Sequence, residues 1–85
     1  MFIKQVVIEG VDGDVEVSRL ERGALVTSGD RVLCVVQRDE SREARYAKAY
    51  EVAKVVCGTD RQGRPNATNS MVHEVLAELN RVAGC

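Results

Sequence analysis

Aromatic residues are scarce in this chain, and tryptophan is absent. Aromatic side chains make up 4% of the 85 residues, whereas hydrophobic residues make up 45% and charged residues 29%. This composition is typical of a folded globular protein and excludes an intrinsically disordered chain. A chain of this length forms one domain with a thin margin of stability. Its core must consist mainly of Val, Leu, Ile and Ala, and it would gain from apolar area buried at an interface.

Metal-binding and disulfide patterns are also lacking. The chain has three cysteines, Cys34, Cys57 and Cys85, and one histidine, His73. Structural zinc sites need about four ligands, usually in closely spaced pairs, and these residues show no such spacing. The cysteines are odd in number, and the opening residues lack the regions of a secretory signal. We therefore expect a cytoplasmic protein with reduced thiols and with no metal and no cofactor.

Long hydrophobic runs and a strong net charge are absent as well. No segment approaches the ~18 apolar residues of a transmembrane helix, so we expect no membrane partner. The net charge of −1 gives the whole chain no electrostatic reason to bind nucleic acid. Residues 1–40 carry five basic and eight acidic side chains (net −3), and residues 41–85 carry seven and five (net +2). This split could orient an encounter with a partner, or it could be an ordinary solvated surface.

The nine residues FIKQVVIEG at positions 2–10 are similar to the opening strand of the chromosome-maintenance (SMC) and related recombination ATPases. In those families the strand leads into a phosphate-binding loop, G-x-x-x-x-G-K-[ST]. The chain contains no such loop and is far too short for such an enzyme. The resemblance is confined to a generic strand, and ATP hydrolysis is excluded with it.

Four segments have the alternating pattern of β-strands, and turn residues separate them. They are Phe2–Glu9, Val15–Leu20, Ala24–Thr27 and Arg31–Gln37. The first and last segments are apolar on both faces, whereas the second alternates cleanly, as expected of an edge or half-exposed strand. We expect two adjacent hairpins with the first and fourth strands central, and a simple meander is the alternative.

Two helices are expected after the strands. Asp39 is a plausible N-cap of the first, which runs to about Cys57 and ends at Gly58. Its apolar stripe comprises Tyr46, Ala49, Tyr50, Ala53, Val56 and Cys57. Ser70 is the expected N-cap of the second helix, which ends at Gly84. Its stripe comprises Val72, Val75, Leu76, Leu79 and Val82.

The predicted fold is therefore an α+β domain spanning residues 1–85. A small, mainly antiparallel four-stranded sheet (1–37) is followed by helix one (38–58), a polar loop (59–70) and helix two (71–84). The loop is long for so small a domain, and loops of this length are often functional or mobile. Two short helices cover one face of such a sheet. The second apolar face predicts a homodimer or a partner protein.

Charged residues provide two candidate partner-binding patches. The acidic patch around the first turn comprises Glu9, Asp12, Asp14 and Glu16. It lacks the ordered ligand series of an EF-hand, so the alternatives are a surface for a basic partner and a hairpin kept soluble by charge. The basic patch on one side of helix one comprises Arg38, Arg42, Arg45 and Lys48, and Arg61 and Arg64 in the loop could extend it. Such residues could contact phosphate or an acidic protein.

A cysteine enzyme is the remote alternative. Cys57 ends one helix and His73 begins the next, so a thiol and a base could meet. The sequence supplies no third group to orient the base, and we expect no catalytic activity.

The sequence thus predicts a small protein–protein interaction module that binds and occludes a larger protein or nucleoprotein. In size and style it looks like many phage- or mobile-element-encoded inhibitors, anti-CRISPR proteins among them, although no motif carries this likeness. The main alternative is a dimeric nucleic-acid-binding protein that uses the basic side of helix one.

Overall fold

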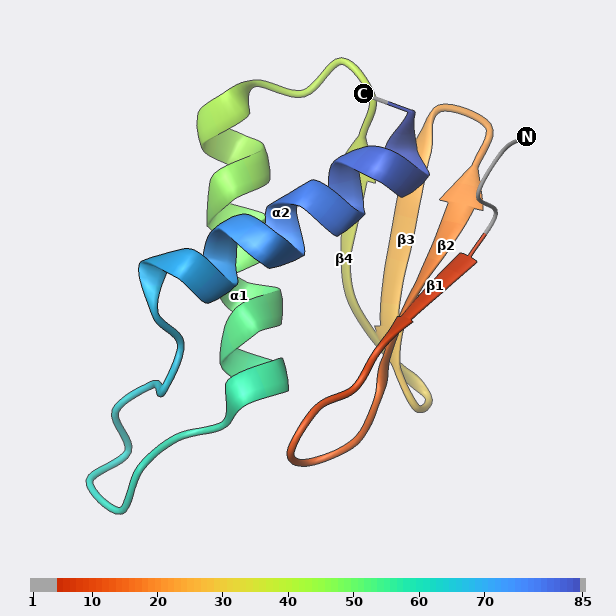
Figure 1. Ribbon diagram of the computed structural model, residues 1–85. Helices are drawn as coiled ribbons and strands as arrows, with labels where there is room; N and C mark the ends of the chain where they lie inside the picture. Colours follow the sequence, from red (N-terminus) through yellow and green to blue (C-terminus); the bar gives the residue numbers. More distant parts are fainter. Residues whose placement is uncertain (1–4, 85) are drawn as a thin grey trace.

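The structure, a computed structural model, describes residues 5–84 (Figure 1). Four strands precede two helices, which confirms the predicted α+β class. The elements are β1 (Gln5–Ile8), β2 (Val15–Leu20), β3 (Gly23–Ser28), β4 (Arg31–Gln37), α1 (Arg42–Cys57) and α2 (Asn69–Ala83). The predicted first strand began at Phe2, and its residues 2–4, like Cys85, lie outside the described residues.

The sheet is an antiparallel meander in the order β1-β2-β3-β4. The expectation that the first and fourth strands are central is wrong, and the simple meander is correct. Short turns connect successive strands, so each strand pairs with the next along the chain. A β-bulge between Val26 and Thr27 shifts the register against β4.

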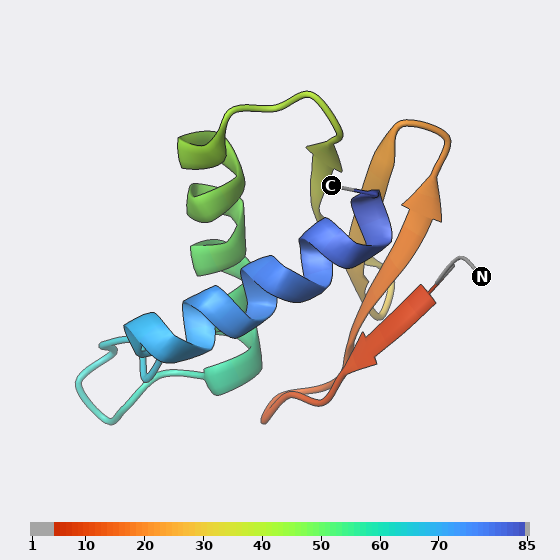
Figure 2. The ribbon, with the colours of Figure 1, turned by 45° about the horizontal axis from the view of Figure 1, so that its top comes forward.

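Both helices pack against the same face of the sheet. In Figures 1 and 2, α2 crosses this face and α1 lies beside α2, toward β4. Contacts of α2 reach all four strands, whereas those of α1 are chiefly with β2 and β4. The fully buried core is aliphatic, and its largest members are Val15, Val17, Val26, Val36, Val52, Val72, Leu79 and Val82. Because the chain has few aromatic residues, its core consists mainly of valine side chains.

The helix starts differ from their predicted positions. Ser41, not Asp39, caps α1, because its hydroxyl accepts a hydrogen bond from the Ala44 N–H at 3.2 Å. Thr68, not Ser70, caps α2, where its hydroxyl accepts from the Met71 N–H at 3.3 Å. The C-terminal glycines, Gly58 and Gly84, lie where they were predicted.

The apolar stripe of α1 also needs correction. Tyr50 is 38% exposed, whereas Val52, which was not assigned to the stripe, is fully buried. Ala49, Ala53 and Val56 are buried as predicted. Tyr50 instead lies on the outer side of α1, where the Lys54 ammonium is 5.4 Å from the centroid of its ring.

The polar loop between the helices folds back on itself. A bridge joins Thr59 to Pro65, and the Asp60 carboxylate accepts hydrogen bonds from the Gln62 and Arg64 N–H groups at 2.8 and 2.9 Å. An aspartate that bonds backbone two residues on is a turn-forming arrangement. Hydrogen bonds within the loop therefore hold the backbone that carries the side chains at its tip.

Candidate functional site

A groove lies between the end of β1, the end of α1 and the first turns of α2. Two adjoining hollows of about 420 and 430 Å³ form it, and they share Glu9, Val56, Cys57 and Met71 as walls. The remaining lining residues are Ile8, Gly10, Val11, Asn66, Glu74, Val75, Ala77 and Glu78. The groove is thus assembled from three segments that are far apart in the sequence.

Two glycines bring the β1–β2 loop against the end of α1. The Val11 N–H donates to the Val56 carbonyl at 2.9 Å, which satisfies one of the last carbonyls of the helix. A Cβ at Gly10 would overlap the Gly13 carbonyl oxygen and lie 3.2 Å from Val56 Cα. A Cβ at Gly58, which has φ +73°, would lie 2.9 Å from a Val11 methyl group. Larger residues at these glycines would push the loop away and widen this end of the groove.

The floor of the groove is apolar and contains two sulfur atoms. The Cys57 thiol donates to the Met71 thioether at 3.4 Å. Val56 and Val75 lie beneath, 8% and 5% exposed, whereas Met71 is 37% exposed. Methionine is flexible and polarizable, so it can adapt to apolar ligands of different shape. The floor therefore suits an apolar side chain of a partner.

The rim of the groove is acidic. Glu9 and Glu74 are exposed, and Glu78 is half-buried. The Glu78 carboxylate accepts from Arg81 at 3.0 Å, whereas no residue that lines the groove is itself basic. Carboxylates that surround an apolar floor attract a ligand that is both cationic and apolar.

The structure divides the predicted acidic patch. Glu9 lies on the groove rim, and Asp12 lies close to Gly58 at the same end of the molecule. Asp14 is exposed in the β1–β2 loop. Glu16 belongs to the opposite face of the sheet, because it pairs with Val7 and Thr27, away from the helices. Only part of the predicted patch can contact a ligand in the groove.

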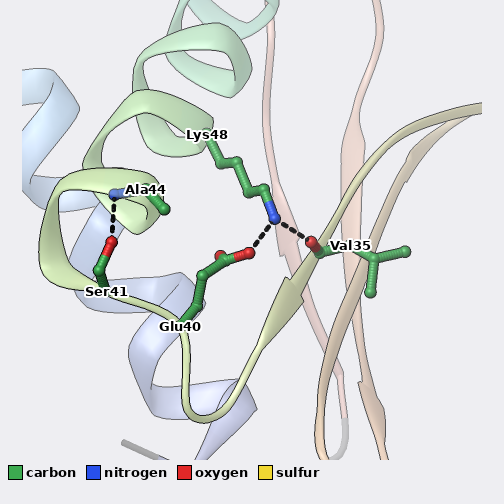
Figure 3. A network of polar contacts seen from close by, with 5 residues as sticks. All are labelled: Val35, Glu40, Ser41, Ala44 and Lys48. Carbon is green, nitrogen blue, oxygen red and sulfur yellow. Dashed lines mark hydrogen bonds and ion pairs between the residues drawn. The ribbon is translucent and has the colours of Figure 1, made fainter.

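The predicted basic patch is divided as well. Arg45 donates to the Asn80 side chain on α2 at 3.1 Å. Lys48 donates to the Val35 carbonyl at 2.7 Å and forms an ion pair with Glu40 (Figure 3). These two side chains join α1 to neighbouring elements, so part of their hydrogen-bonding capacity is used within the fold.

The other basic residues lie at opposite ends of α1. Arg38 precedes the helix and Arg42 begins it, whereas Arg61 and Arg64 lie in the loop beyond its end. Arg42 is the first of the sixteen residues of α1, a helix about 24 Å long, and both loop arginines follow its last residue. The loop arginines therefore do not extend the stripe of α1.

No helix within residues 5–84 lies over the second face of the sheet, and we call this surface the open face. Cross-strand pairing assigns eleven residues to it: Gln5, Val7, Glu16, Ser18, Leu20, Gly23, Leu25, Thr27, Val32, Val35 and Gln37. Val7 and Val32 are 53% and 63% exposed. The sequence predicted a spare apolar face. Of the eleven residues of the open face five are apolar (Val7, Leu20, Leu25, Val32 and Val35), four are uncharged and polar, one is Gly23 and one is Glu16.

The geometry does not join Cys57 to His73. The thiol contacts Met71, whereas the imidazole packs against Tyr46 with ring centroids 5.6 Å apart. Tyr46 precedes Cys57 by eleven residues of α1, about 16 Å along the helix. Between residues 5 and 84 no group of three or more His, Cys, Asp or Glu side chains could hold a metal ion. Within the same range, no helix is long and apolar enough to cross a membrane.

Met71, Glu74 and Glu78 were not predicted as site residues. They recur at three- and four-residue intervals, so they share one side of α2 beside its buried stripe. Two glutamates four residues apart with no basic residue between them were a signal in the sequence. The sequence did not show which surface these glutamates would face. Ile8 and Val56, which line the same groove, are distant from them in the chain.

Comparisons with protein-family models, curated proteins and solved structures find no match to this chain. The groove and the open face therefore carry the functional interpretation on their own.

Proposed function

We propose that this protein is a non-enzymatic binding module that docks a basic segment of a larger protein in its groove. One observation carries the proposal: the groove combines an apolar floor with the carboxylates of Glu9, Glu74 and Glu78 and has no basic lining residue. The bound segment would place an apolar side chain against Met71 and Val75 and would place Lys or Arg side chains at the rim. Rim charges would speed association, and the buried anchor would slow dissociation.

The chemistry of this segment suggests what binding would do. Basic segments with apolar neighbours are common on surfaces that bind nucleic acid. A module that covers such a segment would compete with phosphate for the same Lys and Arg side chains. We therefore propose occlusion of a protein or nucleoprotein surface as the mode of action, in the manner of the mobile-element inhibitors that the chain resembles in size.

The dimeric nucleic-acid-binding alternative has less support. Arg45 and Lys48 contact other parts of the fold, and the loop arginines follow the far end of α1, a helix about 24 Å long. Salt-sensitive binding that survives only with intact nucleic acid would favour this alternative.

A charge-neutralised groove tests the proposal. The tagged wild-type chain and Glu9→Gln/Glu74→Gln are each incubated with host lysate, with and without nuclease, and the captured proteins are quantified by mass spectrometry. The control, Glu21→Gln/Glu43→Gln, removes the same charge from exposed positions outside the groove. We expect one partner to survive nuclease and to fall about tenfold with the groove variant only.

A defined probe makes the result independent of the host. An amphipathic peptide of Leu and Lys is titrated against the labelled protein, and methyl shifts of Ile8, Val56 and Val75 are followed by NMR. The same peptide with Glu in place of Lys should not bind. Equal capture by the groove variant and the control, together with unshifted groove methyls, would reject the proposal.

A further inference from the structure

The open face is nearly without charge. Among its eleven residues only Glu16 is ionisable, although 29% of the chain is charged. Depletion of charge is what distinguishes the centre of a protein interface from the rest of a surface. The valines Val7, Val32 and Val35 are 53%, 63% and 39% exposed on this face. With Glu16 as its single carboxylate, the face offers little to attract the basic segment that suits the groove, so a different partner fits it better.

In one row of residues across the sheet, apolar and polar side chains follow in the same order from either edge. Cross-strand pairing aligns Val7, Glu16, Thr27 and Val32 in that order from β1 to β4. The row is apolar at both edges and polar at both central positions. A surface with this symmetry can match a second copy of itself when the copy is turned about an axis between β2 and β3.

We propose that the open face binds the open face of a second copy of this chain, around a two-fold axis parallel to the strands. Such an axis stacks β1 of one copy on β4 of the other, and β2 on β3. Val7 then lies over Val32 of the second copy, at both edges of the interface. Two sheets that pack in this aligned way are about 10 Å apart, with their strands inclined by about 30°.

The same axis accommodates the polar and bulky residues of the face. Glu16 lies over Thr27 of the second copy, whose hydroxyl can donate to the carboxylate. Leu20 lies over Gly23 of the second copy, the position that has no side chain to oppose it. Because Leu20 and Gly23 are themselves cross-strand partners, this fit occurs on both sides of the axis.

The area of the face determines how strong the dimer can be. Four strands spaced about 4.8 Å apart and about 20 Å long give a footprint of about 400 Å². A standard interface buries about 800 Å² of accessible surface on each partner. We therefore expect a dimer that dissociates on dilution, and it leaves the grooves of both copies free on the outer sides.

Sedimentation equilibrium of the full chain from micromolar to millimolar concentration tests the proposal. The key variant is Val7→Thr/Val32→Thr, which keeps the branched shape and replaces apolar methyls at both edges. The matched control is Val11→Thr, because Val11 is 70% exposed but lies in the β1–β2 loop. We expect the double variant to raise the dissociation constant about tenfold or more and the control to leave it unchanged.

A second variant acts in the opposite direction. The two Glu16 carboxylates flank the axis and repel each other, so Glu16→Gln should tighten the dimer by about threefold. A chain that stays monomeric at millimolar concentration overturns the proposal. A dimer that responds to neither variant overturns it as well, because another surface must then form the contact. The proposed function rests on the groove and survives either of these results.

Discussion

The groove and the open face both expose apolar side chains, yet they differ in charge. Glu9, Glu74 and Glu78 surround the groove, whereas Glu16 is the one ionisable residue of the open face. If exposed apolar area were the only criterion, both surfaces would suit the same kind of partner. Their charges instead indicate a cationic segment for the groove and an equally neutral sheet for the open face. Experiments that change one surface and leave the other intact can test whether the two surfaces bind different partners.

The largest expected effect comes from Gly10→Ala. A methyl group there would overlap the Gly13 carbonyl and press on Val56, so the β1–β2 loop must leave the end of α1. We expect about 2–3 kcal/mol less stability in urea unfolding and loss of groove binding, while the dimer persists. Gly13→Ala in the same loop meets no atom within 4 Å and suffers only from its φ of +134°. If both variants lose equal stability, the packing of the loop on α1 is not what shapes the groove.

Ionic strength should separate the two surfaces without mutation. Binding of the Leu-Lys peptide to the groove should weaken about tenfold between ~0.05 and ~0.5 M salt, because ions screen the rim carboxylates. Dimerisation should stay constant or strengthen, because salt also screens the repulsion between the Glu16 residues. Titration calorimetry and sedimentation on the same samples measure both responses. Parallel loss of both associations would show that one charged surface serves both.

The secondary structure followed from the sequence, whereas the strand order did not. Alternation in Val15–Leu20 and the helical spacing of Val72, Val75 and Leu79 depend on neighbours along the chain, so they are readable in sequence. The order of strands depends on what protects their edges. Lys48 bonds the Val35 carbonyl from thirteen residues away, and nothing in the local pattern indicates this contact. The highly apolar β4 lies at an edge of the sheet, which the preferred arrangement with a central fourth strand did not predict and the meander alternative did.

The groove was only partly predictable for a related reason. The acidic patch around the first turn included Glu9, which does lie on the rim. The floor needs Ile8, Val56 and Met71 to meet, and their proximity depends on the packing of three elements. Likewise, Arg45 was assigned to an exposed stripe because its partner, Asn80, is 35 residues away. Residue spacing shows which side of a helix a residue occupies but not what that side contacts.

A smaller effect is expected from Lys48→Met, which tests the β4 edge of the sheet, away from the groove. The variant removes the hydrogen bond to Val35 and leaves Glu40, 18% exposed, without its ion-pair partner. We expect about 1–2 kcal/mol less stability. Lys54→Met, whose exposed pair with Glu51 lies elsewhere on α1, should lose less than about 0.5 kcal/mol. Equal losses would mean that Lys48 is not closing the edge of β4.

The freed edge should also change how copies associate. An unpaired carbonyl at Val35 leaves β4 open to edge-to-edge pairing with other chains. We expect Lys48→Met to form species larger than a dimer on size-exclusion chromatography, whereas Lys54→Met should not. A dimer of unchanged size in both variants would show that the open face associates independently of the β4 edge.

The smallest expected effect is the contribution of Cys34 to stability at alkaline pH. Burial raises the pKa of this thiol above 9.0; the charge of Lys48 partly offsets this, and that of Glu40 adds to it. Below the pKa of the unfolded chain both states hold the proton, so Cys34 adds no pH dependence. As the pH rises further the unfolded chain ionises first, and stability is lost until the folded thiol also ionises.

The comparison of Cys34→Ala with Cys57→Ala isolates this contribution. The free energy of unfolding is measured in urea between pH 7 and 10.5, and the slope above about pH 9 is compared. Cys34→Ala should have a shallower decline than the wild type, because the thiol responsible has been removed. Cys57→Ala keeps Cys34, so the part of the decline that comes from the Cys34 thiol should remain. Cys34 pairs with Val26 on the helix-covered side of the sheet, opposite the open face, so dimerisation should not alter the difference. A concentration-dependent difference would instead place the edge of β4 within the dimer contact.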